Sequence, residues 1–151
     1  MTIATSLPEF NQEIADTFMG LNDSLTGLPK FLEMKIIDMQ AGTLCAEVEI
    51  TENLLTPFGQ IHGGVLTALI DHALGCVCYP HMQPGQWAAT TEFKLNLLAP
   101  VSTGTLSAVA NIIAMTKSSA VVRIDVHNEG RLCGAAQGTV VIREPRVKPT
   151  L

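Results

Sequence analysis

Hydrophobic and polar positions alternate through most of the second half of the chain, as is typical of half-buried β-strands. Four segments of this kind are separated by turn-forming residues: 87–99, 104–117, 119–130 and 131–144. In the third segment Val122, Ile124 and Val126 form one face, and Asn-Glu-Gly at 128–130 is a good hairpin turn. We therefore expect a run of antiparallel strands after residue 86.

The first third of the chain predicts one short helix and two strands. Residues 8–19 place their apolar side chains on one side of a helix, with polar residues between them. Gly20 and the loop-like residues 22–29 interrupt this pattern. Residues 31–51 alternate about a Gln-Ala-Gly turn and predict a pair of strands.

The middle of the chain predicts one long helix, over residues 64–79, that ends before Pro80. This segment is apolar on nearly every side, so we expect it to be buried on nearly every side. A single apolar helix must be covered by other elements, and we expect a curved antiparallel sheet to enclose it. A second subunit is the best candidate to cover the sheet edges and the loop before the helix.

Composition and charge narrow the class of protein. A chain of 151 residues fits one domain, and 47% apolar residues indicate a well-packed fold. Only 15% of residues are charged, which suggests buried subunit interfaces. The net charge of −5 and the lack of a basic cluster argue against nucleic acid as a partner.

The sequence predicts neither an export signal nor a membrane span. Its N-terminus has no basic region followed by an apolar one, and the apolar stretch 65–79 is too short to span a bilayer. We expect a cytoplasmic protein. The four cysteines lack metal-type spacing and are interpreted as small buried hydrophobic residues in a reducing compartment: Cys45, Cys76, Cys78 and Cys133.

The predicted start of the long helix is a candidate oxyanion site. Gly63 and Gly64 lack Cβ atoms, so a ligand can approach the backbone closely there. The first N–H groups of a helix have no partner within the helix, and the helix dipole is positive at this end. The glycines are equally compatible with a tight turn. His62 has two interpretations as well, a group that orients a carbonyl or a helix cap.

Asp71 lies two turns into the apolar helix and needs an explanation. Burying a carboxylate costs several kcal/mol unless it is paired or reached by water. Its helix face should therefore line a cavity or meet another chain, where Asp71 is a candidate general base. Alternatively, Asp71 pairs with His72, Lys94 or Arg123. His72 and Cys76 have no second ligand pair, so we expect no metal site, and His81 and His127 are interpreted as surface residues.

At these residues the sequence resembles the hotdog-fold thioesterases, in particular their phenylacetate-degradation (PaaI-type) branch. Residues 56–75, TPFGQIHGGVLTALIDHALG, are similar to the loop-and-helix signature, and 90–106 and 121–142 are similar to the later strands. The resemblance covers about 30–144 of a single domain, 1–151. It implies an α+β hotdog fold, with one long central helix wrapped by five or six antiparallel strands and a short N-terminal helix.

The resemblance also implies roles for particular residues. The N–H of Gly63 would polarise a thioester carbonyl, and Asp71 of a neighbouring subunit would act as general base or nucleophile. His62 would help to place the carbonyl, and Thr90 would help to hold the attacking water. No cofactor is implied, and the usual assembly is a dimer of dimers with shared active sites.

One position departs from the family pattern. Thr56 stands six residues before the histidine, where the family often has Asn or Gln that orients the water or the acid. Asn53 is nearby in the chain, and we count Thr56, Asn53 and Gly64 as candidate substrate-binding residues. Five residues are candidates for the acyl pocket: Leu55, Phe58, Tyr79, Met82 and Trp87.

The expected function is hydrolysis of an acyl-CoA thioester to a free acid and CoA. Local basic residues would have to meet the CoA phosphates, and Lys94, Lys117 and Arg123 are candidates. The alternative is a non-catalytic acyl-CoA-binding or regulatory hotdog protein, which the threonine at position 56 keeps open. A hydratase is disfavoured, since the helix lacks the proline-glycine entry of that class.

Overall fold

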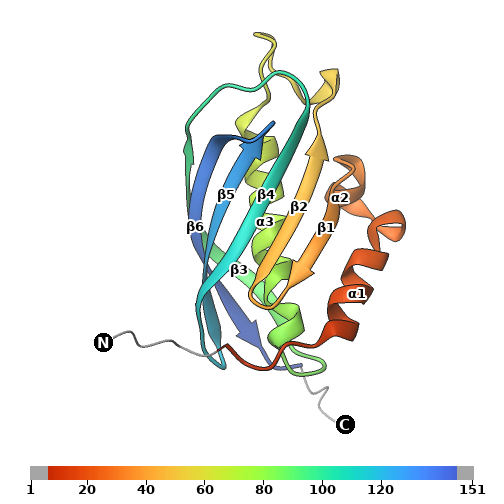
Figure 1. Ribbon diagram of the computed structural model, residues 1–151, viewed down its shortest axis with the longest axis vertical. Coiled ribbons are helices and arrows are strands. Elements are labelled where there is room, and N and C mark those ends of the chain that lie inside the picture. Colours follow the sequence, from red (N-terminus) through yellow and green to blue (C-terminus); the bar gives the residue numbers. More distant parts are fainter. Residues whose placement is uncertain (1–6, 146–151) are drawn as a thin grey trace, which may run out of the picture.

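The computed structural model describes residues 7–145. The two prolines of the tail, 145–151, predict that it frays, and from 146 onwards this tail lies outside the described residues. One long helix lies against a curved antiparallel sheet, as predicted (Figure 1). The strands are β1 (Lys35–Gln40), β2 (Thr43–Glu49), β3 (Trp87–Leu97), β4 (Thr105–Met115), β5 (Ser119–Asn128) and β6 (Arg131–Arg143). The helices are α1 (Gln12–Gly20), α2 (Gly27–Phe31) and α3 (Gly63–Val77), with single 3₁₀ turns η1 (Asn22–Ser24), η2 (Glu52–Leu54) and η3 (Tyr79–His81).

The six strands form one sheet in the order β1-β2-β4-β5-β6-β3, and every pair is antiparallel. The alternation seen in the sequence becomes an inner face of Val, Ile, Leu and Ala side chains packed on α3 and an outer face of mostly polar ones. The strand that follows α3, β3, pairs only with β6, so it forms one edge of the sheet.

The burial of α3 differs from the prediction. One face is buried against the sheet, through Val65, Leu66, Leu69, Ile70, Ala73, Leu74 and Val77. On the opposite face Gly64, Thr67 and Asp71 are exposed. The expectation of burial on nearly every side is wrong for the single chain, because the sheet covers only one side of the helix. The exposed face is available to a ligand or another chain.

The N-terminal region contains a helix that the sequence patterns missed. The predicted helix is present as α1, and it starts at Gln12 because Asn11 Oδ1 caps it by accepting a hydrogen bond from Ile14 N–H (3.2 Å). The short helix α2 forms where we expected a loop. It is anchored at its C-terminal end by Leu32 and Met34, whose side chains are buried.

His81 is buried, with only 5% of its surface exposed, so its assignment as a surface residue is wrong. Gly42 N–H donates to Nε2 (2.9 Å), and Nδ1 donates to the carbonyl oxygen of Pro8 (2.7 Å). The imidazole thus connects the segment before α1 to the β1–β2 turn, a contact between residues far apart in sequence. His127 is half-buried on β5.

Within residues 7–145 we find no helix long and apolar enough to cross a membrane.

Candidate active site

The start of α3 is organised by His62. Its Nδ1 accepts a hydrogen bond from Gly64 N–H (2.9 Å), and its carbonyl oxygen accepts one from Val65 N–H (2.9 Å). His62 is therefore an N-cap, the simpler of its two interpretations. Because Nδ1 accepts, the proton of the neutral ring is on Nε2, and the exposed Nε2–H remains able to donate to a substrate.

The two glycines have different structural requirements. A Cβ on Gly64 would come within 2.9 Å of His62 Nδ1, so the cap itself needs a glycine there. A Cβ on Gly63 would come within 3.0 Å of Leu97 Cδ1, the flexible end of a side chain. No acceptor within the described residues bonds the N–H of Gly63. This N–H, at the positive end of the helix dipole, has the chemistry of an oxyanion donor.

The loop before α3 is held firmly. Ile61 N–H donates to Val101 O (2.7 Å) and His62 N–H donates to Leu54 O (3.0 Å), so the loop is fixed at its base. Thr56 is part of a tight turn, in which its hydroxyl accepts from Phe58 N–H (3.3 Å). Asn53 is exposed in η2 and lines neither of the hollows described below.

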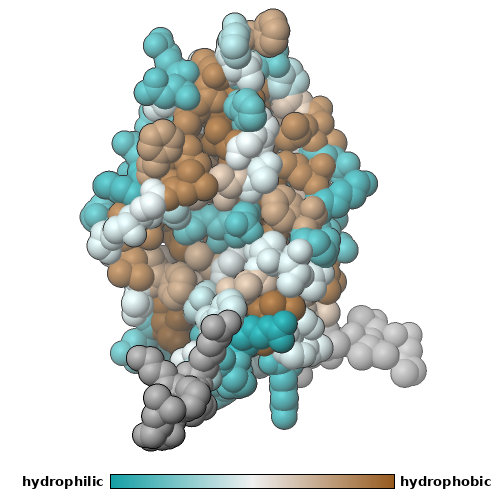
Figure 2. Space-filling model, turned by 180° about the vertical axis from the view of Figure 1, so that it is seen from behind, coloured by the Kyte–Doolittle hydropathy of each residue, from teal (hydrophilic) through white to brown (hydrophobic). Residues whose placement is uncertain are grey.

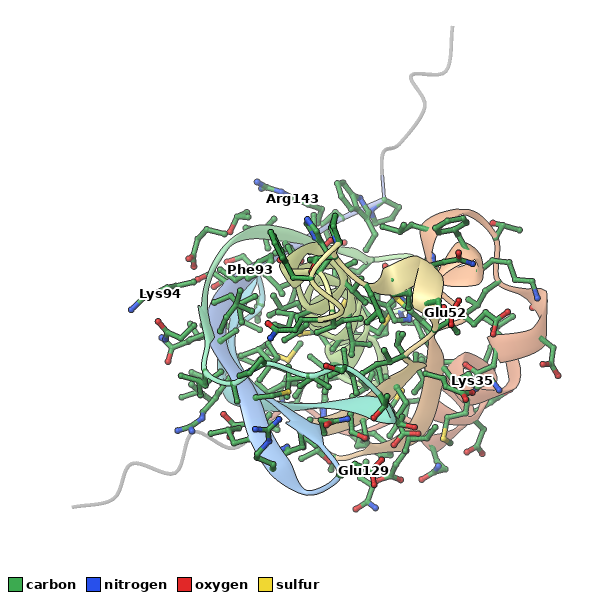
Figure 3. The ribbon with its side chains drawn as sticks, turned by 90° about the horizontal axis from the view of Figure 1, so that it is seen from above. Lys35, Glu52, Phe93, Lys94, Glu129 and Arg143 are labelled. Atoms are coloured by element: carbon green, nitrogen blue, oxygen red, sulfur yellow. The ribbon has the colours of Figure 1, made fainter. Side chains whose placement is uncertain are left out.

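Asp71 is exposed on the open face of α3, where it lines a groove, as expected for its helix face. Within the described part of the chain its carboxylate has no hydrogen bond or ion pair. The expected alternative partners are engaged or turned elsewhere, since Arg123 pairs with Asp125 (3.1 Å) and Lys94 points away from the molecule (Figure 3). Asp71 is thus an unpaired, accessible carboxylate.

His72 behaves differently from its neighbour Asp71. Its Nε2 is buried and finds no hydrogen-bond partner among the described residues. Burial lowers the pKa of His72 below its usual value, although the Asp71 carboxylate opposes this shift. Burial also raises the pKa of the Cys76 and Cys78 thiols to about 12. The two thiols are therefore neutral near pH 7 and are poor nucleophiles, and the His72 imidazole is uncharged there.

A groove of about 540 Å³ lies along the exposed face of α3. It brings together three of the predicted site residues, Gly64, Asp71 and Thr90. The sequence patterns missed the other residues that line it, which are Leu28, Thr67, Ala68, Thr91, Glu92 and Phe93. Leu28 comes from α2, which has no periodic pattern to reveal it. The strand pattern of β3 was correct, but it did not indicate which residues would face this groove.

Gly63 opens into a different hollow, of about 260 Å³, between the loop and residues 97–100. Asp71 lies eight positions after Gly63. In an α-helix this is about 12 Å along the axis and a rotation of roughly 80° beyond two full turns. A single chain therefore keeps the free N–H and the free carboxylate apart. The candidate basic residues Lys94, Lys117 and Arg123 line neither hollow.

Comparison with known proteins identifies the family. Residues 58–135, just over half of the chain, match the thioesterase superfamily, and the chain belongs to this family. A 1,4-dihydroxy-2-naphthoyl-CoA hydrolase of Listeria monocytogenes is 28% identical over 121 residues, which are 80% of this chain and 98% of that protein.

Solved structures agree with this fold. A thioesterase of Haemophilus influenzae superimposes with a TM-score of 0.81 at 22% identity, covering 88% of this chain and 94% of its own. The PaaI protein of the Escherichia coli phenylacetic acid degradation operon has a TM-score of 0.79 at 22% identity, covering 90% and 98%. At these identities the likeness is one of fold, and it confirms the predicted hotdog architecture.

Proposed function

We propose that the protein is an acyl-CoA thioesterase whose active site is shared between two copies of the chain. One observation carries this proposal: α3 presents two unsatisfied groups, Gly63 N–H and the Asp71 carboxylate, in hollows too far apart to act together in one chain. Two copies with their α3 helices side by side and antiparallel would pair Gly63 of each with Asp71 of the other. A two-fold axis would create two identical sites.

The chemistry follows from these groups. Gly63 N–H and His62 Nε2–H would donate to the thioester carbonyl oxygen and stabilise the negative charge that develops on it. The carboxylate of Asp71 would take a proton from water as the water oxygen bonds to the carbonyl carbon. Collapse of the tetrahedral intermediate would break the C–S bond, and the proton would pass to the CoA sulfur. The products are a free acid and CoA, and Thr90, in the same groove as Asp71, is proposed to help hold the water.

The surface supports a two-copy assembly. Large apolar side chains are exposed at the hollow beside Gly63 and on the preceding turn, namely Phe58 (90% exposed), Leu97 and Leu98. Figure 2, which views the molecule from the side of α3, shows extensive hydrophobic areas on this face. The edge strand β3 also has unpaired backbone groups along one side, which a second copy can satisfy. A dimer of dimers remains our expectation for the full assembly.

The name of the Listeria relative, a CoA-thioester hydrolase, supports this reaction class. Thr56 is compatible with it, although its hydroxyl accepts a hydrogen bond within the turn and offers no amide. Asn53 is not near either hollow, so we do not propose a role for it. The acyl-CoA-binding alternative differs from the hydrolase only in turnover, and it is the outcome that the following experiment separates.

The test is release of free thiol from a panel of acyl-CoAs by the wild type and Asp71→Asn. Loss of a general base costs about 100-fold or more in rate. Asp16→Asn, which changes an exposed aspartate on α1, is the matched control and should keep wild-type turnover. Equal rates for wild type and Asp71→Asn would remove Asp71 from the chemistry. Binding of acyl-CoAs with no thiol release by the wild type would establish the binding protein instead.

A further inference from the structure

The groove beside Asp71 has a composition that restricts the acyl group. The open face of α3 contributes Gly64, which has no side chain, and Thr67 and Ala68, whose side chains are small. The large apolar residues that line the groove are Phe93 of β3 and Leu28 of α2. If Asp71 activates the water, the reacting carbonyl lies within reach of it, and the acyl group attached to that carbonyl continues along this groove.

Resting on the proposed thioesterase activity, we propose that the substrate carries an uncharged, apolar acyl group and that Leu28 sets the size of acyl group that fits. The residue determines specificity and takes no part in bond making.

The charges of the lining residues support the first part of this proposal, an uncharged acyl group. The ionisable residues that line the groove are Asp71 and Glu92, both acidic. Lys94, adjacent in sequence to Phe93, points to the outer side of the sheet, whereas Phe93 packs against the core on the side of α3 (Figure 3). An acyl group that ends in a carboxylate would meet the Asp71 carboxylate and no cation, while the Glu92 carboxylate accepts a hydrogen bond from Thr139 Oγ1–H (2.6 Å). Like charges within a partly desolvated groove repel one another, so dicarboxylic acyl groups are disfavoured.

The anchoring of α2 supports the second part of the proposal, that Leu28 sets the size of the acyl group. Leu28 O accepts from Leu32 N–H (3.0 Å), and Pro29 O accepts from Met34 N–H (2.9 Å), so α2 is bonded to the segment that enters β1. Leu32 and Met34 are buried in the core and hold α2 in place. Leu28 itself is 56% exposed, so its side chain projects from this firm base into the groove.

The experiment compares acyl-chain selectivity in four proteins: wild type, Leu28→Ala, Leu28→Trp and Phe31→Ala. Phe31 is also on α2 and is 77% exposed, but it does not line the groove, so it is the matched control. The substrates are saturated acyl-CoAs from two to twelve carbons, with succinyl-CoA and glutaryl-CoA as charged counterparts. kcat/KM is measured for each combination of protein and substrate.

We expect Leu28→Ala to favour longer acyl chains and Leu28→Trp shorter ones. The ratio of kcat/KM between long and short substrates should change by about 10-fold or more, the usual effect of one or two methylene groups in an apolar pocket. Phe31→Ala should keep the wild-type ratio. The dicarboxylic substrates should be about 10-fold poorer than neutral ones of equal length, because their second carboxylate meets Asp71 and no cation.

Three results would overturn the proposal while the hydrolase stands. The first is an unchanged chain-length ranking in both Leu28 variants, and the second is a preference for the dicarboxylic substrates. A change of oligomeric state in Leu28→Ala, seen by size-exclusion chromatography, would also overturn it, because Leu28 would then belong to a subunit contact.

A second measurement separates this inference from the proposed function. Acyl-CoA thioether analogues of the same lengths cannot be hydrolysed, and their Kd reports the acyl groove alone. If the Kd ranking depends on Leu28 and no thioester is turned over, the thioesterase fails and the acyl groove stands. If turnover is present and the Kd ranking is the same in the Leu28 variants as in the wild type, only the role of Leu28 in acyl selection fails.

Discussion

Replacing Gly63 by proline isolates one atom group of the proposed site, the backbone N–H that polarises the carbonyl. Gly63 is the first residue of α3, a position where proline is well tolerated because its missing N–H has no partner within the helix. The preceding residue, His62, has φ −70° and ψ 132°, which is the extended conformation that a residue before proline prefers. The substitution should therefore remove the donor and retain the helix.

The magnitude follows from the donor that is lost. Removal of one oxyanion donor costs about 100- to 1,000-fold in kcat, or about 2.7–4 kcal/mol of transition-state stabilisation. Gly63→Ala is the matched control, because it adds a Cβ with the same 3.0 Å approach to Leu97 Cδ1 but keeps the N–H. The difference in kcat between the alanine and proline variants then gives the contribution of the N–H to transition-state stabilisation.

The assay is steady-state thiol release, followed by a mixing experiment. Gly63→Pro and Asp71→Asn are each nearly inactive, and equal amounts are unfolded together and refolded. If subunits pair at random, about half of the dimers are mixed, and in each one site receives both changes while the other receives neither. One quarter of wild-type activity should return.

Two results would refute this reasoning. Recovery no greater than the sum of the two variants would mean that Gly63 and Asp71 act within one chain or not at all. Equal kcat for Gly63→Pro and Gly63→Ala, with both proteins folded by circular dichroism, would mean that the N–H does not contact the transition state.

Three further predictions concern stability and are measured by urea unfolding. His81→Ala should lower the free energy of unfolding by about 2–4 kcal/mol, because one buried hydrogen bond, one part-buried hydrogen bond and the packing of the ring are lost, and a change below about 0.5 kcal/mol would contradict this. The pKa of His72 is lowered in the folded state, so the unfolded chain binds more protons as pH falls below its ordinary value of 6.5. The free energy of unfolding should therefore decrease towards pH 5, and it should decrease less steeply in His72→Gln. An equal dependence on pH in both proteins would exclude His72 as the cause of this loss of stability. Gly138→Ala would bring a Cβ within 2.5 Å of Phe93 Cβ and 2.6 Å of Glu92 O, and it should cost about 1–3 kcal/mol, whereas Gly20→Ala meets nothing within 4 Å and should cost none.

Much of the fold is encoded in local patterns. Strands show a period of two because one face packs on the core, and Val122, Ile124 and Val126 occupy that face in β5 as predicted. The long helix was recognisable from its composition and from Pro80 beyond its end, and the histidine-glycine-glycine run marked its start. These features depend on residues close together in the chain, so the sequence by itself determined them.

The tertiary structure alone decided which surfaces are covered and which groups meet. The apolar composition of α3 predicted full burial, but burial depends on what lies opposite each face, and the sheet lies opposite only one. Leu28 and His81 acquire their places through contacts with residues distant in sequence, which no local pattern encodes. The two separate hollows at Gly63 and Asp71 are likewise lined by residues distant in sequence, and they indicate why one chain is not enough for the proposed chemistry.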